Sequence, residues 1–318
     1  MNIPNFLRTS AALLCVGVLM AVSGCATNSA PTTTPQTISN QATGNSISTH
    51  AEHSSEGDSG TSAAKQTATK PTKPTPPPMV KLGSHTALAS YLNESLSLLG
   101  YMPVQFSPAH QMTTTAAMQT LSQTKAPLPG GYAWKDKGTA GQLSALWSPL
   151  TDNVITEGAL MRFQDDHHLA VDGVAGPEVW QALNEALKTQ QTTQAPYLFI
   201  TVTEHPTEVL KVWKNGTVAL ETPANTGISQ SPTALGTWPI YLRYQSQEMK
   251  GTTPWGTTYD DPGVPYVNYF YQSEAVHGFP RASYGSPQSM GCVEIPIATA
   301  QTVFNMVSLG TLVSVRSS

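Results

Sequence analysis

The spacing of apolar residues changes near Tyr197, and this change limits what the chain can fold into. Upstream, apolar residues recur every three or four positions, as in Leu88, Leu92, Leu96 and Leu99, which is typical of α-helices. Downstream, short runs of β-branched and aromatic residues alternate with turn signals, which is typical of strands. We therefore predict a helical region followed by a mostly β region.

Three helices are predicted upstream. Gly100 ends the first, and a second runs from Thr156 to about His167. The third opens at Gly176-Pro177, because proline is favoured in the first turn of a helix. Residues 101–150 hold several prolines and glycines, and we expect long loops and short helices there.

Strands are predicted downstream, beginning with residues 198–202. Asn215-Gly216 between two β-rich runs is the strongest short signal for a hairpin. One helix is expected late in this region, over residues 298–307. The remaining predicted strands cover residues 209–213, 217–220, 237–244, 266–271 and 311–315.

The charge of the chain argues against one class of partner. Only 11% of the 318 residues are charged, the formal net charge is −4, and no basic run is present. The chain therefore has no electrostatic attraction to nucleic acid, and we expect no nucleic-acid partner. Its length suffices for two modest domains.

The first 25 residues are typical of an export signal. Arg8 precedes an apolar run, residues 11–22, that is too short to span a membrane comfortably. The run ends in Ser23-Gly24-Cys25, and small residues before a cysteine resemble a lipobox, where bacterial lipoproteins are cleaved and lipidated. We predict a lipoprotein signal over residues 1–25 and a lipid on Cys25, which anchors the protein to a membrane outside the cytoplasm. The alternative is an ordinary signal peptide with an incidental cysteine.

Residues 26–79 lack periodic apolar residues and end in a proline-rich run, Lys70 to Pro78. Such a composition cannot bury enough surface to offset the entropy of ordering the chain. The proline-rich end is expected to be extended. We interpret this segment as a disordered tether between the membrane and the folded domains.

One cysteine is left without a partner. Of the three cysteines, Cys15 lies in the predicted signal and Cys25 carries the predicted lipid, which leaves Cys292. Thiols outside the cytoplasm usually form disulfides. Cys292 is therefore either buried and inert or chemically reactive.

A candidate base, His277, lies 15 residues before this cysteine. A nucleophilic cysteine needs such a base, and the alternative, His205, precedes a proline in a predicted turn.

Gly291 would let a substrate carbonyl approach the backbone, where free N–H groups form an oxyanion hole worth about 3 kcal/mol per donor. The other interpretations are a structural pair, or a zinc site of His277, Cys292 and Glu294.

The chain has His277-Gly278, and then Ser289-Met290-Gly291-Cys292-Val293-Glu294. With Asn225-Thr-Gly227 upstream, the stretch from about Tyr197 to Val315 resembles the L,D-transpeptidase catalytic domain, often called YkuD-type. That family's motif is His-Gly, a gap, and Ser-His-Gly-Cys followed by Val or Ile and usually Arg. The resemblance implies a mostly β fold over residues 196–316, a YkuD-type β-sandwich with one late helix, and no metal or organic cofactor.

The resemblance also implies a role for each motif residue. Cys292 attacks a peptidoglycan stem tetrapeptide at the bond between a diamino acid and D-alanine, and carbapenems acylate the same thiol. His277 takes the thiol proton, the Gly278 carbonyl orients its ring, and the N–H groups of Gly291 and Cys292 stabilise the oxyanion. An amine acceptor gives a cross-link, whereas water gives an L,D-carboxypeptidase or endopeptidase. A non-catalytic lipoprotein that binds the wall is the third interpretation.

Two positions depart from the family's motif. Met290 replaces its second histidine, and Glu294 replaces its arginine. We hypothesise that Glu294 favours a cationic acceptor amine while Arg281 or Arg243 contacts substrate carboxylate, the alternative being a structural glutamate.

Trp255 and Tyr259 fall in a stretch, residues 251–263, where a loop would form a lid over the donor. The expected substrate-binding set is Ser289, Met290, Glu294, Arg281, Trp255 and Tyr259.

Residues 156–187 resemble a small helical peptidoglycan-binding domain through Phe163-Gln164, residues 169–177 and residues 180–183. The implied domain is all-α, covers residues 80–190 and contacts the wall. Residues 104–150 have no counterpart in that resemblance.

Overall fold

The computed structural model describes residues 78–317. The predicted signal, the lipid on Cys25 and the tether as far as residue 77 lie outside these residues. Within the described range, no helix is both long and apolar enough to cross a membrane.

The upstream region contains the three predicted helices. The side chain of Asn153 caps α4 by accepting from the N–H groups of Ile155 and Thr156, and Pro177 lies in the first turn of α5. The helices are α1 (Ala87–Leu98), α2 (Thr114–Thr124), α3 (Lys137–Leu143), α4 (Val154–Asp166) and α5 (Pro177–Thr189), with a 3-10 turn over Ser144–Leu146.

This region is not purely helical, which corrects the all-α expectation. Strand β1 (Val104–Pro108) pairs antiparallel with β2 (Gly130–Trp134). Gly130 permits the pairing, because a Cβ there would lie 2.5 Å from the ring of Phe106. Pro103 and Pro108 at the two ends of β1, and Pro127 and Pro129 just before β2, obscured the pair in the sequence.

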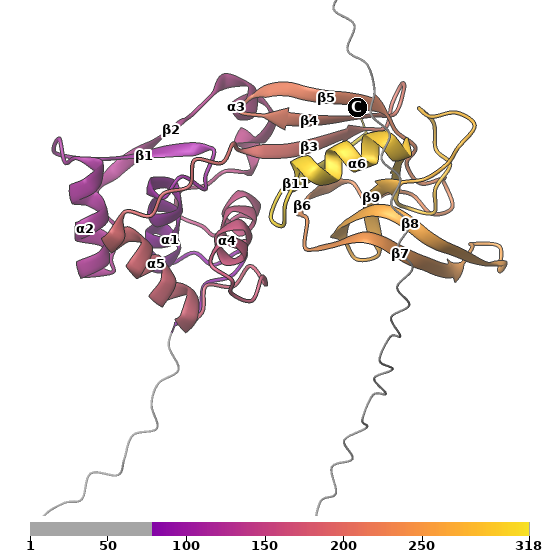
Figure 1. Ribbon diagram of the computed structural model, residues 1–318. Helices are drawn as coiled ribbons and strands as arrows, with labels where there is room; N and C mark the ends of the chain where they lie inside the picture. Colours follow the sequence, from indigo (N-terminus) through magenta and orange to yellow (C-terminus); the bar gives the residue numbers. More distant parts are fainter. Residues whose placement is uncertain (1–77, 318) are drawn as a thin grey trace, which may run out of the picture. The chain divides into compact units, whose positions relative to one another are not determined.

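The downstream region is built from two sheets and one late helix, as expected (Figure 1). A five-stranded sheet has the order β5-β4-β3-β11-β6, and a four-stranded sheet has the order β10-β9-β8-β7. Their elements are β3 (Leu198–Thr203), β4 (Val209–Lys214), β5 (Thr217–Pro223), β6 (Gly236–Pro239), β7 (Leu242–Thr252), β8 (Thr258–Tyr271), β9 (Glu274–Gly278), β10 (Val293–Ile295), α6 (Ile297–Met306) and β11 (Leu312–Arg316).

The predicted hairpin is confirmed. Asn215 and Gly216 join β4 to β5, and both have positive φ, 47° and 75°. Positive φ at both turn residues defines the turn type that Asn-Gly favours.

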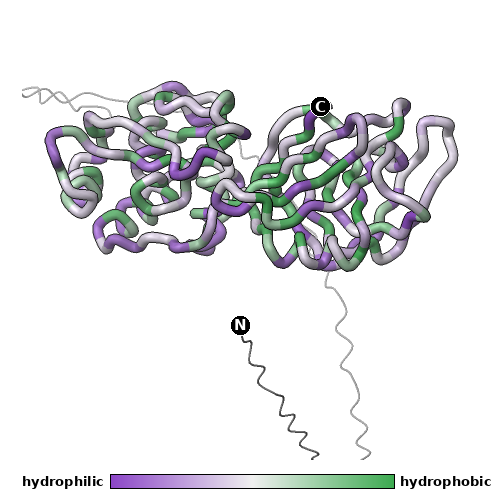
Figure 2. Tube along the Cα trace, turned by 90° about the horizontal axis from the view of Figure 1, so that it is seen from above, coloured by the Kyte–Doolittle hydropathy of each residue, from purple (hydrophilic) through white to green (hydrophobic). Residues whose placement is uncertain are grey.

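Both sheets and the late helix share an apolar core. Ile200 and Val313 come from the five-stranded sheet, Val276 and Ile295 from the four-stranded one, and Val303 from α6. Figure 2 shows hydrophobic segments gathered inside the molecule and hydrophilic ones on its turns. Phe199 and Leu312 also join the apolar cluster of the helices, and the described residues belong to one compact unit.

Two predictions in the middle of the β region were wrong. The single strand expected over residues 237–244 is two strands, β6 and β7. The expected loop over residues 251–263 is instead the end of a long β7–β8 hairpin, in which Gly251 pairs with Tyr259. A Cβ on Gly251 would lie 2.5 Å from the Tyr259 hydroxyl, so the glycine lets the tyrosine ring cross the neighbouring strand.

Candidate active site

One pocket of about 250 Å³ brings together most of the predicted site residues. Strands β9 and β10 build it, because their parallel pairing places Glu294 opposite His277 and so brings Cys292 near the histidine. The hairpin of β7 and β8 contributes the opposite wall. The charged or reactive side chains in the lining are Asp261, His277, Arg281, Cys292 and Glu294, together with Tyr259 and Met290.

The imidazole of His277 is buried and held in one orientation. Its Nδ1 lies 3.1 Å from the carbonyl oxygen of Gly278, and only 3% of the residue is exposed. Burial lowers the pKa of His277, against smaller raising effects of the Gly278 carbonyl and Glu294. A neutral ring that donates from Nδ1 leaves Nε2 as a proton acceptor.

The thiol of Cys292 is partly buried and protonated. Burial raises its pKa to about 12, and the nearby carboxylates of Glu294 and Glu274 add to the effect, while the N–H of Ala275 opposes it. Its hydrogen bond goes to the Ser273 carbonyl oxygen at 3.8 Å. The thiol hydrogen therefore has to turn from the Ser273 carbonyl before it can pass to His277.

The turn before the cysteine is held by hydroxyl groups. The Ser289 hydroxyl donates to the Cys292 carbonyl at 2.5 Å and accepts the N–H of Gly291 at 3.1 Å. The Gly291 carbonyl accepts from the hydroxyl of Thr233 at 2.9 Å. Gly291 has a φ of 115°, which glycine adopts without strain.

This arrangement rules out the Gly291 N–H as an oxyanion donor and leaves the Cys292 N–H available. The N–H of Gly291 is already bonded to Ser289, so it is not a free oxyanion donor. The Cys292 N–H points away from Thr233, because the carbonyl and N–H of a trans peptide unit point in opposite directions. By the same reasoning the Met290 N–H points away from Ile228, whose N–H bonds the Ser289 carbonyl. Neither the Cys292 nor the Met290 N–H has an acceptor within the described residues.

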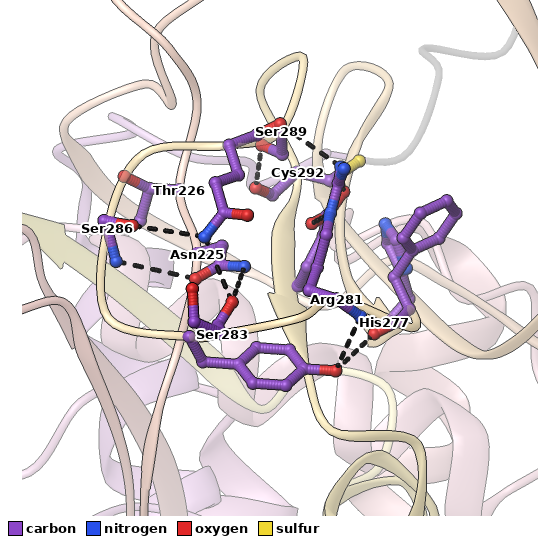
Figure 3. Close-up of polar contacts among 12 residues, drawn as sticks. Asn225, Thr226, His277, Arg281, Ser283, Ser286, Ser289 and Cys292 are labelled. Atoms are coloured by element: carbon purple, nitrogen blue, oxygen red, sulfur yellow. Dashed lines mark hydrogen bonds and ion pairs between the residues drawn. The ribbon is translucent and has the colours of Figure 1, made fainter.

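Asn225 and Thr226 fix the loop that carries Ser289 (Figure 3). The Asn225 side chain donates to the Ser283 carbonyl at 3.2 Å and accepts the N–H of Gly285 at 3.0 Å. The Thr226 carbonyl accepts the N–H groups of residues 288 and 289. The Asn225-Thr-Gly227 triplet was a signal in the sequence, although its positioning role was not predicted.

A second supporting residue, Glu208, gave no signal. Its buried carboxylate accepts both the N–H and the hydroxyl of Thr226, at 2.5 and 2.7 Å. Burial raises the pKa of Glu208, and the Thr226 hydrogen bonds oppose that effect. Nothing in the sequence around Glu208 indicates that its carboxylate would bind Thr226.

Glu294 is paired rather than free. Its two carboxylate oxygens accept from Nε and Nη2 of Arg281, both at 2.7 Å, and Arg281 also lies over the ring of Phe279. The positive charge of Arg281 largely cancels the negative charge of Glu294, so the pair attracts a charged ligand only weakly. Arg243 lies elsewhere, bonded to Asn268 and to the Phe304 carbonyl.

The two aromatic residues of the hairpin have different positions. Tyr259 lines the pocket, whereas Trp255 lies in the turn between β7 and β8 with 61% of its surface exposed. The expected substrate-binding set is therefore only partly brought together, since Ser289 supports the turn and Trp255 projects into solvent.

Across residues 78–317, no three His, Cys, Asp or Glu side chains form a metal-binding group.

Two family models match this chain. Residues 196–315 match the L,D-transpeptidase catalytic domain called YkuD, and residues 152–183 match a peptidoglycan binding domain. No curated protein matches.

Solved structures of L,D-transpeptidases are similar to part of this chain. The catalytic domain from E. faecium is 27% identical, with a TM-score of 0.35, over 39% of this chain and 100% of its own length. An enzyme from Mycobacterium smegmatis is 22% identical, with a TM-score of 0.34, over 38% of this chain and 59% of its own. The chain thus spans about six tenths of that relative.

The catalytic-domain model covers the strands from β3 to β11, except the last residue of β11, and both residues of the Cys–His pair. Residues 196–315 of this chain therefore carry the match to the YkuD family of L,D-transpeptidase catalytic domains.

Proposed function

We propose that the chain is a peptidoglycan L,D-transpeptidase in which Cys292 is the nucleophile and His277 the base. The observation that carries the proposal is that a thiol and an orientated, neutral imidazole line one pocket inside a matched catalytic domain. Because the thiol keeps its proton at neutral pH, it needs a base to become a nucleophile.

The reaction has two acyl transfers. As the thiol proton passes to Nε2 of His277, the sulfur attacks the stem-peptide carbonyl and the amide C–N bond breaks. D-alanine leaves with that proton, and a thioester remains. The acceptor amine then attacks the thioester, its proton returns through His277 to the sulfur, and a new amide is released.

The oxyanion of each tetrahedral intermediate needs hydrogen-bond donors. The N–H groups of Cys292 and Met290 serve here, since both point away from the segment that holds the turn and neither is engaged within the described residues. Replacement of the family's histidine by Met290 leaves this backbone donor in place.

Two carboxylates line the pocket, those of Asp261 and Glu294. Glu294 is neutralised by Arg281, whereas Asp261 forms no ion pair within the described residues. It therefore attracts a cationic acceptor amine, the role first expected of Glu294. The ammonium held there releases one proton to water, and the neutral amine then attacks the thioester, so the acyl-enzyme is resolved as a cross-link rather than by hydrolysis.

The location follows from both matched domains. Peptidoglycan lies outside the cytoplasm, and residues 152–183 match a domain that binds it. We place the Cys25 lipid anchor and the tether in this proposal as the means of holding the catalytic domain near the wall.

Intact-mass measurement after incubation of the full chain with a carbapenem tests the nucleophile and base. We expect one covalent adduct, absent in Cys292→Ala and formed about 100-fold more slowly in His277→Asn. The exposed His205 provides the matched control, because His205→Asn should react at the normal rate. An adduct that persists in Cys292→Ala, or none in the wild type, contradicts the proposal.

Incubation with disaccharide tetrapeptides separates the two acceptors. Cross-linked dimers support the transpeptidase, whereas tripeptides alone identify a carboxypeptidase that uses water.

A further inference from the structure

A second pocket, of about 520 Å³, is lined by α1 and by residues of the segment 104–150, which has no counterpart in the resemblance. It is formed by α1, the β1–β2 pair and residues 147–150, outside the two matched spans at 152–183 and 196–315. Its lining includes a carboxylate and three aromatic rings, and neither lysine nor arginine contributes to it.

The carboxylate belongs to Glu94 of α1. Only 4% of the residue is exposed, and its Oε2 accepts the N–H of Leu128 at 2.7 Å. Its other oxygen accepts no hydrogen bond, and no cation pairs with it, within residues 78–317. A buried carboxylate without a counter-charge is costly, and burial raises the pKa of Glu94 to about 7, against the smaller lowering effect of the Leu128 N–H. A cation in the pocket would favour the ionised form of Glu94, so the pocket is electrostatically complementary to a cation.

The aromatic walls suit the same ligand. The rings of Phe106 and Tyr132 have centroids 5.1 Å apart, and those of Tyr132 and Trp147 lie 5.2 Å apart. The faces of such rings attract ammonium groups, Trp most strongly. The Tyr132 hydroxyl is buried without a hydrogen-bond partner in the described part of the chain, so Tyr132 contributes its ring rather than its hydroxyl to the pocket.

We propose that this pocket binds an aliphatic primary ammonium group, such as the side chain of a lysine or another diamino acid in a peptide. The ammonium has three N–H donors, of which one reaches the free oxygen of Glu94 while the others face the aromatic rings. Its methylene chain lies along the aromatic and proline rings. The absence of cationic lining disfavours anionic ligands. The inference is independent of the Cys292 chemistry.

Chemical-shift titration of the full chain compares two probes that differ only in charge. Nα-acetyl-lysine amide carries the ammonium, and Nα-acetyl-norleucine amide has nearly the same chain without it. We expect the lysine probe to shift signals of the pocket and to bind at least about tenfold more tightly.

Three variants make the assignment specific. Glu94→Gln keeps an acceptor for the Leu128 N–H but removes the charge, and should weaken lysine binding about tenfold. Tyr132→Phe keeps the ring and should leave lysine binding nearly unchanged, because the buried hydroxyl has no surface open to a ligand. Glu185→Gln, on an exposed face of α5, should leave the affinity unchanged.

Equal binding of the two probes, or an unchanged affinity in Glu94→Gln, would overturn the proposal. Binding of a neutral N-acetylglucosamine tetramer at the pocket, with none of the lysine probe, would also overturn it and assign the pocket to a sugar.

Discussion

Glu294 lies opposite His277 in the parallel pairing of β9 and β10, while Arg281 holds both of its carboxylate oxygens. The carboxylate alone would favour the charged imidazolium. Arg281 offsets that effect, and burial then dominates, so the pKa of His277 is lowered and the ring stays neutral. The salt bridge thus protects the protonation state that a general base requires.

Breaking this pair should cost much more than breaking a surface pair. Arg281→Gln leaves a carboxylate with 6% side-chain exposure unpaired, so the free energy of unfolding should fall by about 3 kcal/mol. Lys211→Gln, which breaks the exposed pair with Glu221, is the control and should cost less than about 1 kcal/mol. Urea unfolding measures both, and equal small losses would show that the Arg281–Glu294 pair contributes little.

The lowered pKa of His277 predicts how stability depends on pH. Below the ordinary pKa of 6.5 the unfolded chain binds a proton that the folded chain does not. The contribution of this histidine is therefore complete above pH 6.5 and is lost as the pH falls toward the folded pKa. Each pH unit costs at most about 1.4 kcal/mol.

Urea unfolding of the wild type and of His277→Asn at pH 7.5 and pH 5 tests this prediction. The wild type should lose more stability than the variant between the two values. Other titrating groups, including His167, are common to both proteins and cancel in the comparison. Parallel losses would mean that His277 titrates normally.

Regular apolar spacing made much of the fold predictable. Thr156 to His167 and Pro177 onward carried clear helical signals, and Asn215-Gly216 specified its hairpin. The β7–β8 hairpin was missed because its outer part is paired by polar residues such as Lys250 and Asp260, which give no alternation of apolar side chains. The β1–β2 pair was missed because prolines surround it.

The site was predictable as far as its motif extended. His277 and Cys292 follow from a free thiol and an upstream histidine, and the structure places both in one pocket. The pairing of Glu294 with Arg281 did not follow, because it depends on a tertiary contact. The Ser289–Gly291 hydrogen bond is local, but it depends on the conformation of the turn, which the residue types alone do not fix. Asp261 was overlooked for a different reason. It enters the site from β8, and the sequence predicts a loop for this part of the strand.

Asp261 should control the acceptor step alone. Asp261→Asn removes the unpaired charge of the pocket, so KM for a cationic acceptor amine should rise about fivefold, equivalent to about 1 kcal/mol. The rate of carbapenem acylation should not change, because that step involves no acceptor. The neighbouring Asp260, which points to the other face of the strand and pairs with Lys250, provides the control Asp260→Asn.

Steady-state kinetics with a tetrapeptide donor and varied amine separates the two effects. An unchanged acceptor KM in Asp261→Asn, or an equal rise in Asp260→Asn, would exclude Asp261 as the acceptor contact.

Asp152 should destabilise the protein at neutral and alkaline pH. It is 1% exposed, and neither carboxylate oxygen has a hydrogen-bond partner in the described part of the chain. Burial, with a smaller effect of Glu157, raises its pKa from 3.8 to about 7. Because the folded pKa is above the unfolded one, stability from this group is complete below pH 3.8 and is lost as the pH rises through 7.

Asp152→Asn removes this ionisation and keeps the backbone carbonyl that accepts the Gly83 N–H. The variant should therefore be more stable than the wild type at pH 8, by on the order of 2–4 kcal/mol, and nearly equal to it at pH 4. Urea unfolding at the two pH values measures the difference, with the exposed Asp165→Asn as a control that should show neither gain. A gain of the same size at both pH values would point to packing rather than charge. The lack of any gain at pH 8 would show that water solvates the Asp152 carboxylate in the folded protein.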